Sequence, residues 1–270
     1  MENEKTTQQT YALVTGATGG LGSAFAETLA ARGNALILTG RSEEKLLSFK
    51  EKLLEKYPDL SVRVYAANLA DEGSRYAMTQ KIKAENLRIS LLVNAAGADV
   101  QKAFEIYTEE KLVFQSRVNF EAAVSLCRFA IEQRAERLEI INVSSVSGIY
   151  PMPYFAIYSA TKCALTSFSE ALHTEMKGKN VSVTAVLPGA MPTREDIKEQ
   201  IKGQGLWGKL AVKSPAWVAE YSLNAVRKNK RKVIPGFWNN VMRISTALLP
   251  ASWKLHFIAK RWSKISKDAF

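Results

Sequence analysis

A glycine-rich turn at residues 15–22 constrains the fold of this chain more than any other feature. An apolar run at residues 11–17 is typical of a buried strand that enters the turn, and residues 21–32 have a helical pattern. Three glycines permit a tight turn and let a pyrophosphate approach the N-terminus of that helix: Gly16, Gly20 and Gly22. The segment predicts a nucleotide-binding turn, although an ordinary strand-to-helix turn also uses glycine.

Strand and helix patterns alternate along the rest of the chain. A long helix is expected over residues 108–134, and a helix that contains Tyr158 is expected to end near Lys177. This alternation predicts an α/β fold, a doubly wound parallel sheet (Rossmann fold) of about seven strands in a single domain. The further strands are expected at residues 35–39, 62–68, 89–93, 138–143, 181–187 and 233–234. The expected organisation is a polar N-terminal segment (1–10), the sheet domain (11–236) and a basic, amphipathic helical extension (237–270).

Composition argues against several classes of protein. No apolar run reaches the roughly 18 residues of a membrane span, and the polar N-terminus has no signal-peptide core. A cytoplasmic location is therefore expected, with peripheral contact at the inner face of the membrane as the alternative. The two cysteines, Cys127 and Cys163, lack metal-ligand spacing and are expected to be reduced core thiols. The two histidines suit surface or packing roles, so no metal site is predicted.

The pair Tyr158 and Lys162 is the strongest candidate for chemistry. Residues four apart lie on one face of a helix, so the two side chains are expected to point into the same space. A tyrosine hydroxyl normally has a pKa of about 10, and a nearby ammonium group stabilises the phenolate and lowers that pKa. The pair is therefore a candidate acid/base catalyst. Ser145, thirteen residues before Tyr158, is the candidate partner hydroxyl, and the neighbouring Ser144 is the alternative.

Several separated motifs occur in a fixed order along the chain. They are the TGxxxGxG turn (15–22), the NxAG segment (94–97), Asn119, Ser145, the YxxxK pair, and a PG turn followed by a threonine (Pro188, Gly189, Thr193). Over about residues 10–236 the sequence thereby resembles the short-chain dehydrogenase/reductase family. The resemblance implies an enzyme that interconverts carbonyl groups and alcohols with a nicotinamide cofactor.

The resemblance also implies a role for each motif residue. Tyr158 would be the general acid in ketone reduction and the base in the reverse direction, while Lys162 would bind the nicotinamide ribose and lower the pKa of Tyr158. Ser145 would hydrogen-bond the substrate oxygen, and Asn119 would hold a water that relays protons to Lys162. The implied catalytic residues are Asn119, Ser145, Tyr158 and Lys162. The implied cofactor contacts are Gly16, Thr18, Gly20, Leu21, Gly22, Arg41, Ser42, Asn68, Leu69, Asn94, Ala95, Gly97, Tyr158, Lys162, Pro188, Gly189 and Thr193, the last beside the nicotinamide carboxamide.

The end of the second expected strand distinguishes the two nicotinamide cofactors. An NAD enzyme of this type usually has an acid there, which binds the ribose 2′-hydroxyl. This chain has Gly40, Arg41 and Ser42, and a guanidinium beside a hydroxyl suits a 2′-phosphate, so NADP(H) is predicted. Two positions depart from the family pattern. Asn68 replaces an adenine-binding aspartate, although its amide oxygen can still accept a hydrogen bond, and Ala95 replaces the second asparagine of NNAG.

The net positive charge is concentrated near the C-terminus. Residues 226–270 contain 11 Lys and Arg and one acid, whereas the rest of the chain is near neutral. A basic helix with tryptophans fits the surface of an anionic membrane, and a helix packed over the substrate cleft or a neighbouring subunit is the alternative. Four apolar residues of this tail have helical spacing: Leu255, Ile258, Trp262 and Ile265.

Three functions are compatible with these features. The first is an NADP(H)-dependent carbonyl reductase, or the matching alcohol dehydrogenase, for a small apolar substrate such as a fatty acyl, sphingoid-like or steroid-like ketone. The second is a non-catalytic NADP(H)-binding sensor or scaffold, which the complete set of Ser145, Tyr158 and Lys162 disfavours. The third is nucleic-acid binding by the basic tail, but no recognition motif is present, so no specific nucleic acid is expected. By analogy with the family, a homodimer or homotetramer is expected to form through the Asn119 and Tyr158 helices.

Overall fold

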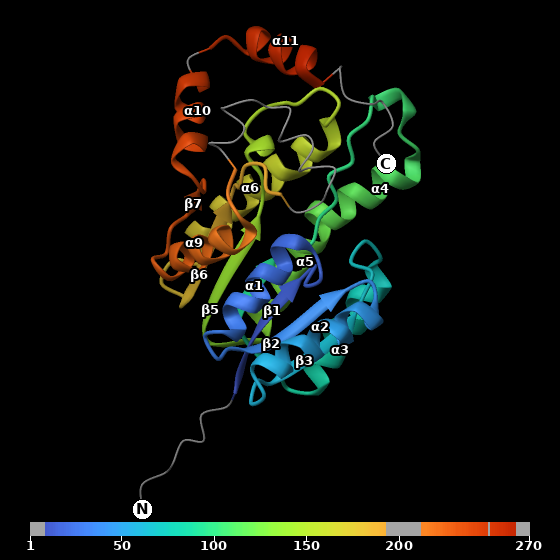
Figure 1. Cartoon of the computed structure of the whole chain (residues 1–270), viewed down its shortest axis with the longest axis vertical. Helices are drawn as coiled ribbons and strands as arrows, with labels where there is room; N and C mark the ends of the chain where they lie inside the picture. The colour runs from blue at the N-terminus through green and yellow to red at the C-terminus, as the bar shows by residue number, and fades with distance from the viewer. Residues whose placement is uncertain (1–8, 193–211, 248, 263–270) are drawn as a thin grey trace, which may run out of the picture.

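In the computed structural model, the chain is built around a single parallel sheet (Figure 1). The structure describes residues 9–192, 212–247 and 249–262. In this part of the chain the sheet has seven strands in the order β3-β2-β1-β4-β5-β6-β7, and all neighbouring strands are parallel. The strand order reverses between β1 and β4, where α/β sheets of this type bind ligands. This arrangement confirms the predicted doubly wound α/β fold.

Strands and helices alternate as far as α9. The strands are β1 (Thr10–Thr15), β2 (Ala35–Gly40), β3 (Val62–Ala66), β4 (Arg88–Asn94), β5 (Arg134–Val143), β6 (Val181–Val186) and β7 (Lys232–Val233). The helices are α1 (Gly20–Ala30), α2 (Glu43–Lys56), α3 (Glu72–Ala84), α4 (Glu109–Ser116), α5 (Ala122–Glu132), α6 (Ala156–Glu175), α9 (Pro215–Arg227), α10 (Phe237–Ala247) and α11 (Ala251–Trp262). Shorter turns are η1 (Phe104–Ile106), η2 (Arg117–Glu121) and η3 (Val146–Gly148). Side-chain caps begin four of the helices: Ser42, Asp71, Thr108 and Ser214.

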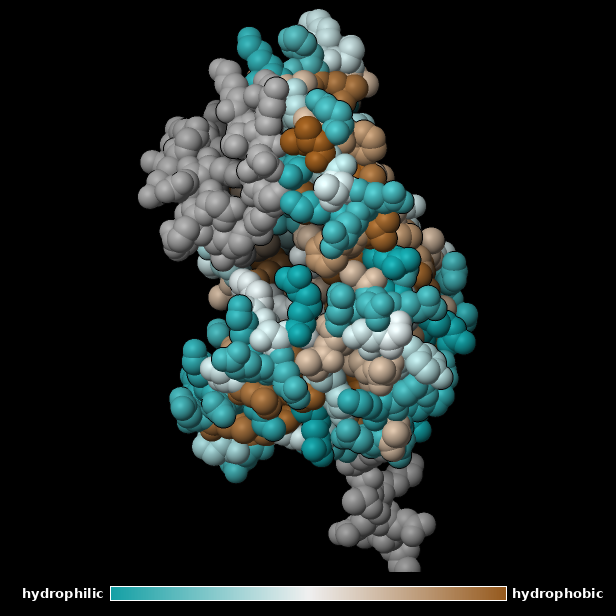
Figure 2. Space-filling view, turned by 90° about the vertical axis from the view of Figure 1, so that its right-hand side faces the viewer, coloured by the Kyte–Doolittle hydropathy of each residue, from teal (hydrophilic) through white to brown (hydrophobic). Residues whose placement is uncertain are grey.

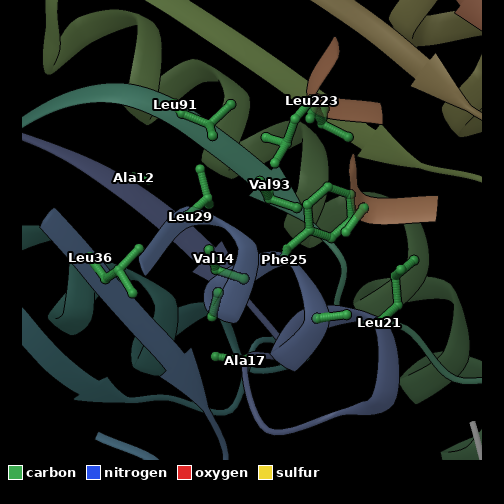
Figure 3. Packing of buried hydrophobic residues seen from close by; sticks show 14 of the residues in the cluster. Ala12, Val14, Ala17, Leu21, Phe25, Leu29, Leu36, Leu91, Val93 and Leu223 are labelled. Carbon is green, nitrogen blue, oxygen red and sulfur yellow. The ribbon is translucent and has the colours of Figure 1, made fainter. Parts of the chain in front are cut away.

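The sheet separates two hydrophobic cores. Alternate residues of a strand face opposite sides of the sheet, so Val14 and Leu38 lie in one core, whereas Leu13 and Ile37 lie in the other. Helices α1, α2 and α9 cover the first core, and α3, α5 and α6 contribute to the second. Figure 3 shows Phe25 of α1 in the first core, where full burial of such a side chain stabilises the fold by about 1.5–3 kcal/mol. The two cores therefore fix the strand ends from which the site segments leave.

Two segments differ from the predicted pattern. β5 begins at Arg134, earlier than the predicted start at residue 138, and its pairing with β4 is irregular, because Ile89 pairs with Arg134 but Leu91 pairs with Glu139. The polar start of this strand has no apolar alternation that would predict it. The helix predicted over residues 108–134 is interrupted by a π-helical turn, η2, which separates α4 from α5.

The C-terminal extension contains two helices in its described part. Figure 1 shows α10 and α11 at one end of the molecule, beyond the sheet. Among the residues that the structure describes, no helix is long and apolar enough to cross a membrane. The prediction of two core thiols is correct for Cys127, which is buried, and wrong for Cys163, which is exposed on α6.

Candidate active site

The glycine turn between β1 and α1 is packed too closely for larger residues. Gly16 has a φ of +62°, in the left-handed region that side chains rarely adopt. A Cβ atom on Gly22 would lie 2.1 Å from the carbonyl oxygen of Gly16. The hydroxyl oxygen of Thr15 accepts hydrogen bonds of 3.0 Å from the backbone N–H groups of Ala95 and Ala96, which connects the turn to the segment after β4. The turn therefore fits a pyrophosphate at the N-terminus of α1.

Asn94, a predicted cofactor contact, has its side chain in the core beneath the site. Its Nδ2 donates to Oδ1 of Asn142 at 2.8 Å and to the carbonyl oxygen of Ala123 at 3.3 Å. Asn142 in turn donates to the hydroxyl oxygen of Ser169, on α6, at 2.9 Å. These buried bonds hold β4 and β5 against the helices behind them and turn the Asn94 side chain into the core, where its Oδ1 has no partner among the described residues.

Asn119 lies buried in the π-helical turn η2 and connects three segments. Its Oδ1 accepts from the N–H of Ala98 at 2.7 Å, and its Nδ2 donates to the carbonyl oxygen of Ala98 at 2.9 Å and to the hydroxyl of Thr161 at 3.2 Å. A Cβ atom on Gly97 would lie 3.1 Å from Oδ1 of Asn119 and 3.4 Å from Nζ of Lys162. The structure thus brings Asn119, Gly97 and Lys162 together. No residue pattern predicts this π turn, a feature that is frequent at functional sites.

The two serines after β5 have different surroundings. The hydroxyl of Ser144 donates to the carbonyl oxygen of Lys162 at 2.8 Å and pairs with the hydroxyl of Thr166 at 2.7 Å. The hydroxyl oxygen of Ser145 accepts from the N–H of Ser147 at 3.1 Å and caps η3. Within the described part of the chain, the O–H of Ser145 has no acceptor. This difference favours Ser145 as the hydroxyl that is available to a substrate.

Tyr158 and Lys162 lie one turn apart on α6. Tyr158 is half-buried and Lys162 is buried. The Nζ atom of Lys162 lies 5.8 Å from the centre of the Tyr158 ring and donates to the carbonyl oxygen of Val143, at the end of β5, at 2.8 Å. Burial lowers the pKa of Lys162 to about 8, although the nearby carboxylate of Asp99 acts in the opposite direction. The arrangement places a cation that can stabilise a phenolate beside the tyrosine.

The residues predicted to select the cofactor lie where β2 meets α2. Arg41 is exposed, and its guanidinium carbon lies 5.8 Å from the centre of the Phe114 ring. Ser42 caps α2 by accepting from the N–H of Lys45 at 3.3 Å. A cavity of about 340 Å³ opens nearby, and its lining includes Thr18, Glu44, Lys45 and Lys52. Lys45 was not among the predicted residues, and its place in the first turn of α2 makes it a second cation for an anionic group.

The segment after β3 is linked to the turn η2 by a buried arginine, Arg75. Asn68 is exposed, and its Oδ1 accepts from the N–H of Ala70 at 3.2 Å, which leaves a second lone pair for another donor. Leu69 is buried, and its carbonyl oxygen accepts from Arg75 at 2.7 Å. Arg75 also forms an ion pair with Glu121 of η2. Sequence reasoning missed Arg75, which joins the predicted adenine segment to the turn that carries Asn119.

The turn after β6 contacts both the serine segment and α10. The carbonyl oxygen of Pro188 accepts from the N–H of Val146 at 3.1 Å. A Cβ atom on Gly189 would lie 2.8 Å from the side-chain nitrogen of Asn239, so α10 packs directly on this turn. Thr193, the predicted carboxamide contact, lies outside the described residues.

Similarity to known proteins identifies the family. A sequence profile described as short chain dehydrogenase matches residues 10–202. The chain belongs to this family. Membership in the short chain dehydrogenases confirms the family resemblance that the motifs indicate.

Two curated relatives of this short chain dehydrogenase and one solved structure are informative. A very-long-chain 3-oxoacyl-CoA reductase of Bos taurus is 35% identical over 195 residues, which cover 68% of this chain and 60% of the relative. A 3-ketodihydrosphingosine reductase of Bacteroides thetaiotaomicron is 31% identical over 183 residues, which cover 67% of this chain and 64% of the relative. The crystal structure of L-sorbose reductase from Gluconobacter frateurii, complexed with NADPH and L-sorbose, is 25% identical with a TM-score of 0.74 and covers 85% of this chain and 96% of that chain. The chain thus spans about 60% of the length of the curated relatives it matches.

Proposed function

We propose that this short chain dehydrogenase is an NADP(H)-dependent oxidoreductase that interconverts a ketone and a secondary alcohol on an apolar, lipid-like substrate. The observation that carries the proposal is the packing of the serine segment (Ser144 and Ser145), at the carboxyl end of β5, against α6, the helix that carries Tyr158 and Lys162. The bond from Lys162 to Val143 fixes the lysine at the strand end, two residues before Ser145. The bonds from Ser144 to α6 hold the serine segment against the same helix.

Each polar group has a definite task in this proposal. When bound, NADPH would supply the hydride that reduces the carbonyl carbon. The Tyr158 hydroxyl gives its proton to the carbonyl oxygen, and the Ser145 hydroxyl donates a hydrogen bond to that oxygen as negative charge develops. The Lys162 ammonium stabilises the phenolate that remains on Tyr158. Asn119 holds Ala98 and Thr161 in place beside Lys162, and its part in a proton relay stays a prediction.

The residues present fit NADP(H) better than NAD(H). Thr18, Gly19 and Gly20 are exposed at the N-terminus of α1, so a pyrophosphate can approach it. Arg41 and Lys45 supply two cations near the end of β2, where an NAD enzyme would usually have an acid. The NADPH in the crystal structure of L-sorbose reductase gives further support.

The names of the curated relatives support the choice of substrate class. Both relatives are named for reduction of a ketone: a very-long-chain 3-oxoacyl-CoA in one case and 3-ketodihydrosphingosine in the other. We therefore expect this chain to prefer a 3-keto group on a long apolar chain over a ketone in a polyol.

A substrate panel with NADPH tests the proposal. The full chain is incubated with 3-oxoacyl thioesters of increasing length, 3-ketodihydrosphingosine, a ketosteroid and L-sorbose, and loss of NADPH is followed by absorbance. We expect a secondary alcohol as product, with kcat/KM at least about tenfold higher for the long-chain ketones than for L-sorbose. Binding of NADPH without turnover of any ketone would instead support a non-catalytic sensor, and a preference for L-sorbose would overturn the apolar class.

A further inference from the structure

Helix α10 has its apolar face outward and its polar face against the domain. Phe237 and Ile244 lie two turns apart on one face, with 72% and 60% of their side chains exposed. On the opposite face, Asn239 is buried against Gly189, and Thr246 pairs with the hydroxyl of Tyr150. A surface helix of a soluble domain normally has the reverse arrangement.

Helix α11 continues this outward apolar surface. Trp253 and Phe257 lie one turn apart and are 69% and 67% exposed, and Lys260 is exposed on the same face. Figure 2 shows brown residues among teal ones at the upper end of the molecule, at the height of α11. The face predicted from sequence is a different one. On that face Leu255 is 36% exposed and Ile258 is half-buried, and Ile265 lies outside the described residues.

Tyr150 connects both helices to the candidate active site. This residue follows η3, the turn that Ser145 caps. Its hydroxyl contacts Thr246 and, at 3.4 Å, the carbonyl oxygen of Arg243, both on α10. The Nζ atom of Lys254, on α11, lies 5.7 Å from the centre of its ring. The outward surface is therefore attached to the segment that is expected to border the substrate.

The charge of this surface indicates which kind of partner could bind there. Among the described side chains of α10 and α11 the charged ones are Arg243, Lys254 and Lys260, and none is acidic; Arg243 and Lys260 are exposed, whereas Lys254 is half-buried and faces Tyr150. A second copy of the chain would bring a like charge to the same face, and like charges repel. An anionic lipid surface has complementary charge, and its boundary layer accommodates Trp and Phe side chains.

We propose that the outward face of α10 and α11, formed by Phe237, Ile244, Trp253, Phe257 and Lys260, docks on an anionic lipid bilayer. Docking there brings the Tyr150 segment, and with it the candidate active site, close to the lipid surface. Delivery of a lipid-like ketone from that surface rests on the proposed function. The docking itself does not, since it is measured without turnover.

Vesicle sedimentation with the full chain tests the docking. Wild type is mixed with vesicles of phosphatidylcholine, or of phosphatidylcholine with phosphatidylglycerol, at low and high salt. The test variant carries Phe237→Glu, Trp253→Glu and Phe257→Glu, and Lys260→Glu is a separate variant for the electrostatic part. Tyr76→Glu is the matched control, because Tyr76 on α3 is 65% exposed. NADPH binding and thermal melts verify that each variant is folded.

We expect wild type to bind the anionic vesicles at least about tenfold more tightly than the neutral ones, and to bind them more weakly at high salt. The triple variant should lose at least about tenfold in affinity, Lys260→Glu should lose less, and Tyr76→Glu should behave as wild type. The proposal is overturned if wild type does not sediment with anionic vesicles, or if the triple variant binds as well as wild type. A wild-type dimer that the triple variant dissociates, without vesicle binding, would show that a second copy covers the face.

Discussion

The ammonium nitrogen of Lys162 lies 5.8 Å from the centre of the Tyr158 ring and is held there by a hydrogen bond to the main-chain oxygen of Val143. The lysine is buried and the tyrosine is half-buried, so the cation approaches the tyrosine from the protein side. A charge in this position is costly to bury, which lowers the pKa of Lys162 to about 8.

The stability of the fold should depend on pH through Lys162. Its pKa is about 8 in the folded chain, against an ordinary value of 10.5. Between these values the unfolded chain binds more protons, so the free energy of unfolding should rise as pH rises. Lys162→Met removes this dependence, so the stability of wild type relative to the variant should increase by about 2 kcal/mol between about pH 7.5 and 10. Denaturant unfolding at both pH values measures this change, and a constant difference would contradict the account.

Substitution of Ser144 should mainly lower the stability of the fold, whereas substitution of Ser145 should mainly lower activity. Ser144→Ala removes a buried hydroxyl with two partners on α6, so unfolding should become easier by about 1–2 kcal/mol, while kcat/KM of the folded protein stays within about threefold. Ser145→Ala should leave the melting temperature nearly unchanged and lower kcat/KM by about a hundredfold or more, because it removes the donor to the substrate oxygen. Melting curves and steady-state kinetics on both variants compare the two effects. The reverse pattern would identify Ser144 as the active hydroxyl.

Gly22 should tolerate no side chain. In Gly22→Ala the new Cβ would lie 2.1 Å from the Gly16 carbonyl oxygen, and a backbone contact of this kind cannot relax cheaply. We expect a loss of at least about 2 kcal/mol in stability together with weaker NADPH binding. Gly73→Ala is the matched control, because its Cβ would have an ordinary 3.5 Å contact in the first turn of α3. That variant should be neutral or more stable by up to about 0.5 kcal/mol, and equal melting temperatures for the two variants would contradict the predicted clash.

Arg41 should set the preference for NADPH over NADH. A charge-assisted bond to phosphate is worth about 1.5–3 kcal/mol, so Arg41→Ala should weaken NADPH binding roughly ten- to a hundredfold and NADH binding by much less. Lys45→Ala should also weaken NADPH binding more than NADH binding, but by a smaller factor than Arg41→Ala. Lys56→Ala, at the opposite end of α2, is the control and should change neither affinity. Titration calorimetry with both cofactors gives the result, and equal dissociation constants for wild type would rule out the 2′-phosphate assignment.

Local patterns were sufficient to predict the fold and to nominate candidate site residues, whose roles stay predictions. The glycine turn and the apolar strands each depend on a few neighbouring residues, and the structure has both. The π turn at Asn119 could not be predicted, since a change of helical hydrogen bonding leaves no residue pattern. The bond between Arg75 and Glu121 joins residues 46 apart and exists only after α3 packs beside η2.

The tail illustrates a second limit of sequence reasoning. Helical spacing shows which residues share a face, but it does not show which face points outward. The spacing drew attention to the face of Leu255, Ile258, Trp262 and Ile265. Among the described side chains of α11, the most exposed apolar ones are Trp253 and Phe257, while Leu255 is less exposed and Ile258 is half-buried. Tyr150 contacts both C-terminal helices, and these contacts join residues distant in the sequence, so helical spacing alone could not predict the orientation.

The most direct measurement is the kcat/KM of Tyr158→Phe for ketone reduction with NADPH. The substitution removes the transferable proton and keeps the ring beside Lys162. We predict a fall of at least about a hundredfold in kcat/KM with an NADPH dissociation constant within about twofold of wild type, while Tyr76→Phe, a substitution at an exposed tyrosine, behaves as wild type. Near-normal turnover by Tyr158→Phe would contradict the assignment of Tyr158 as the general acid.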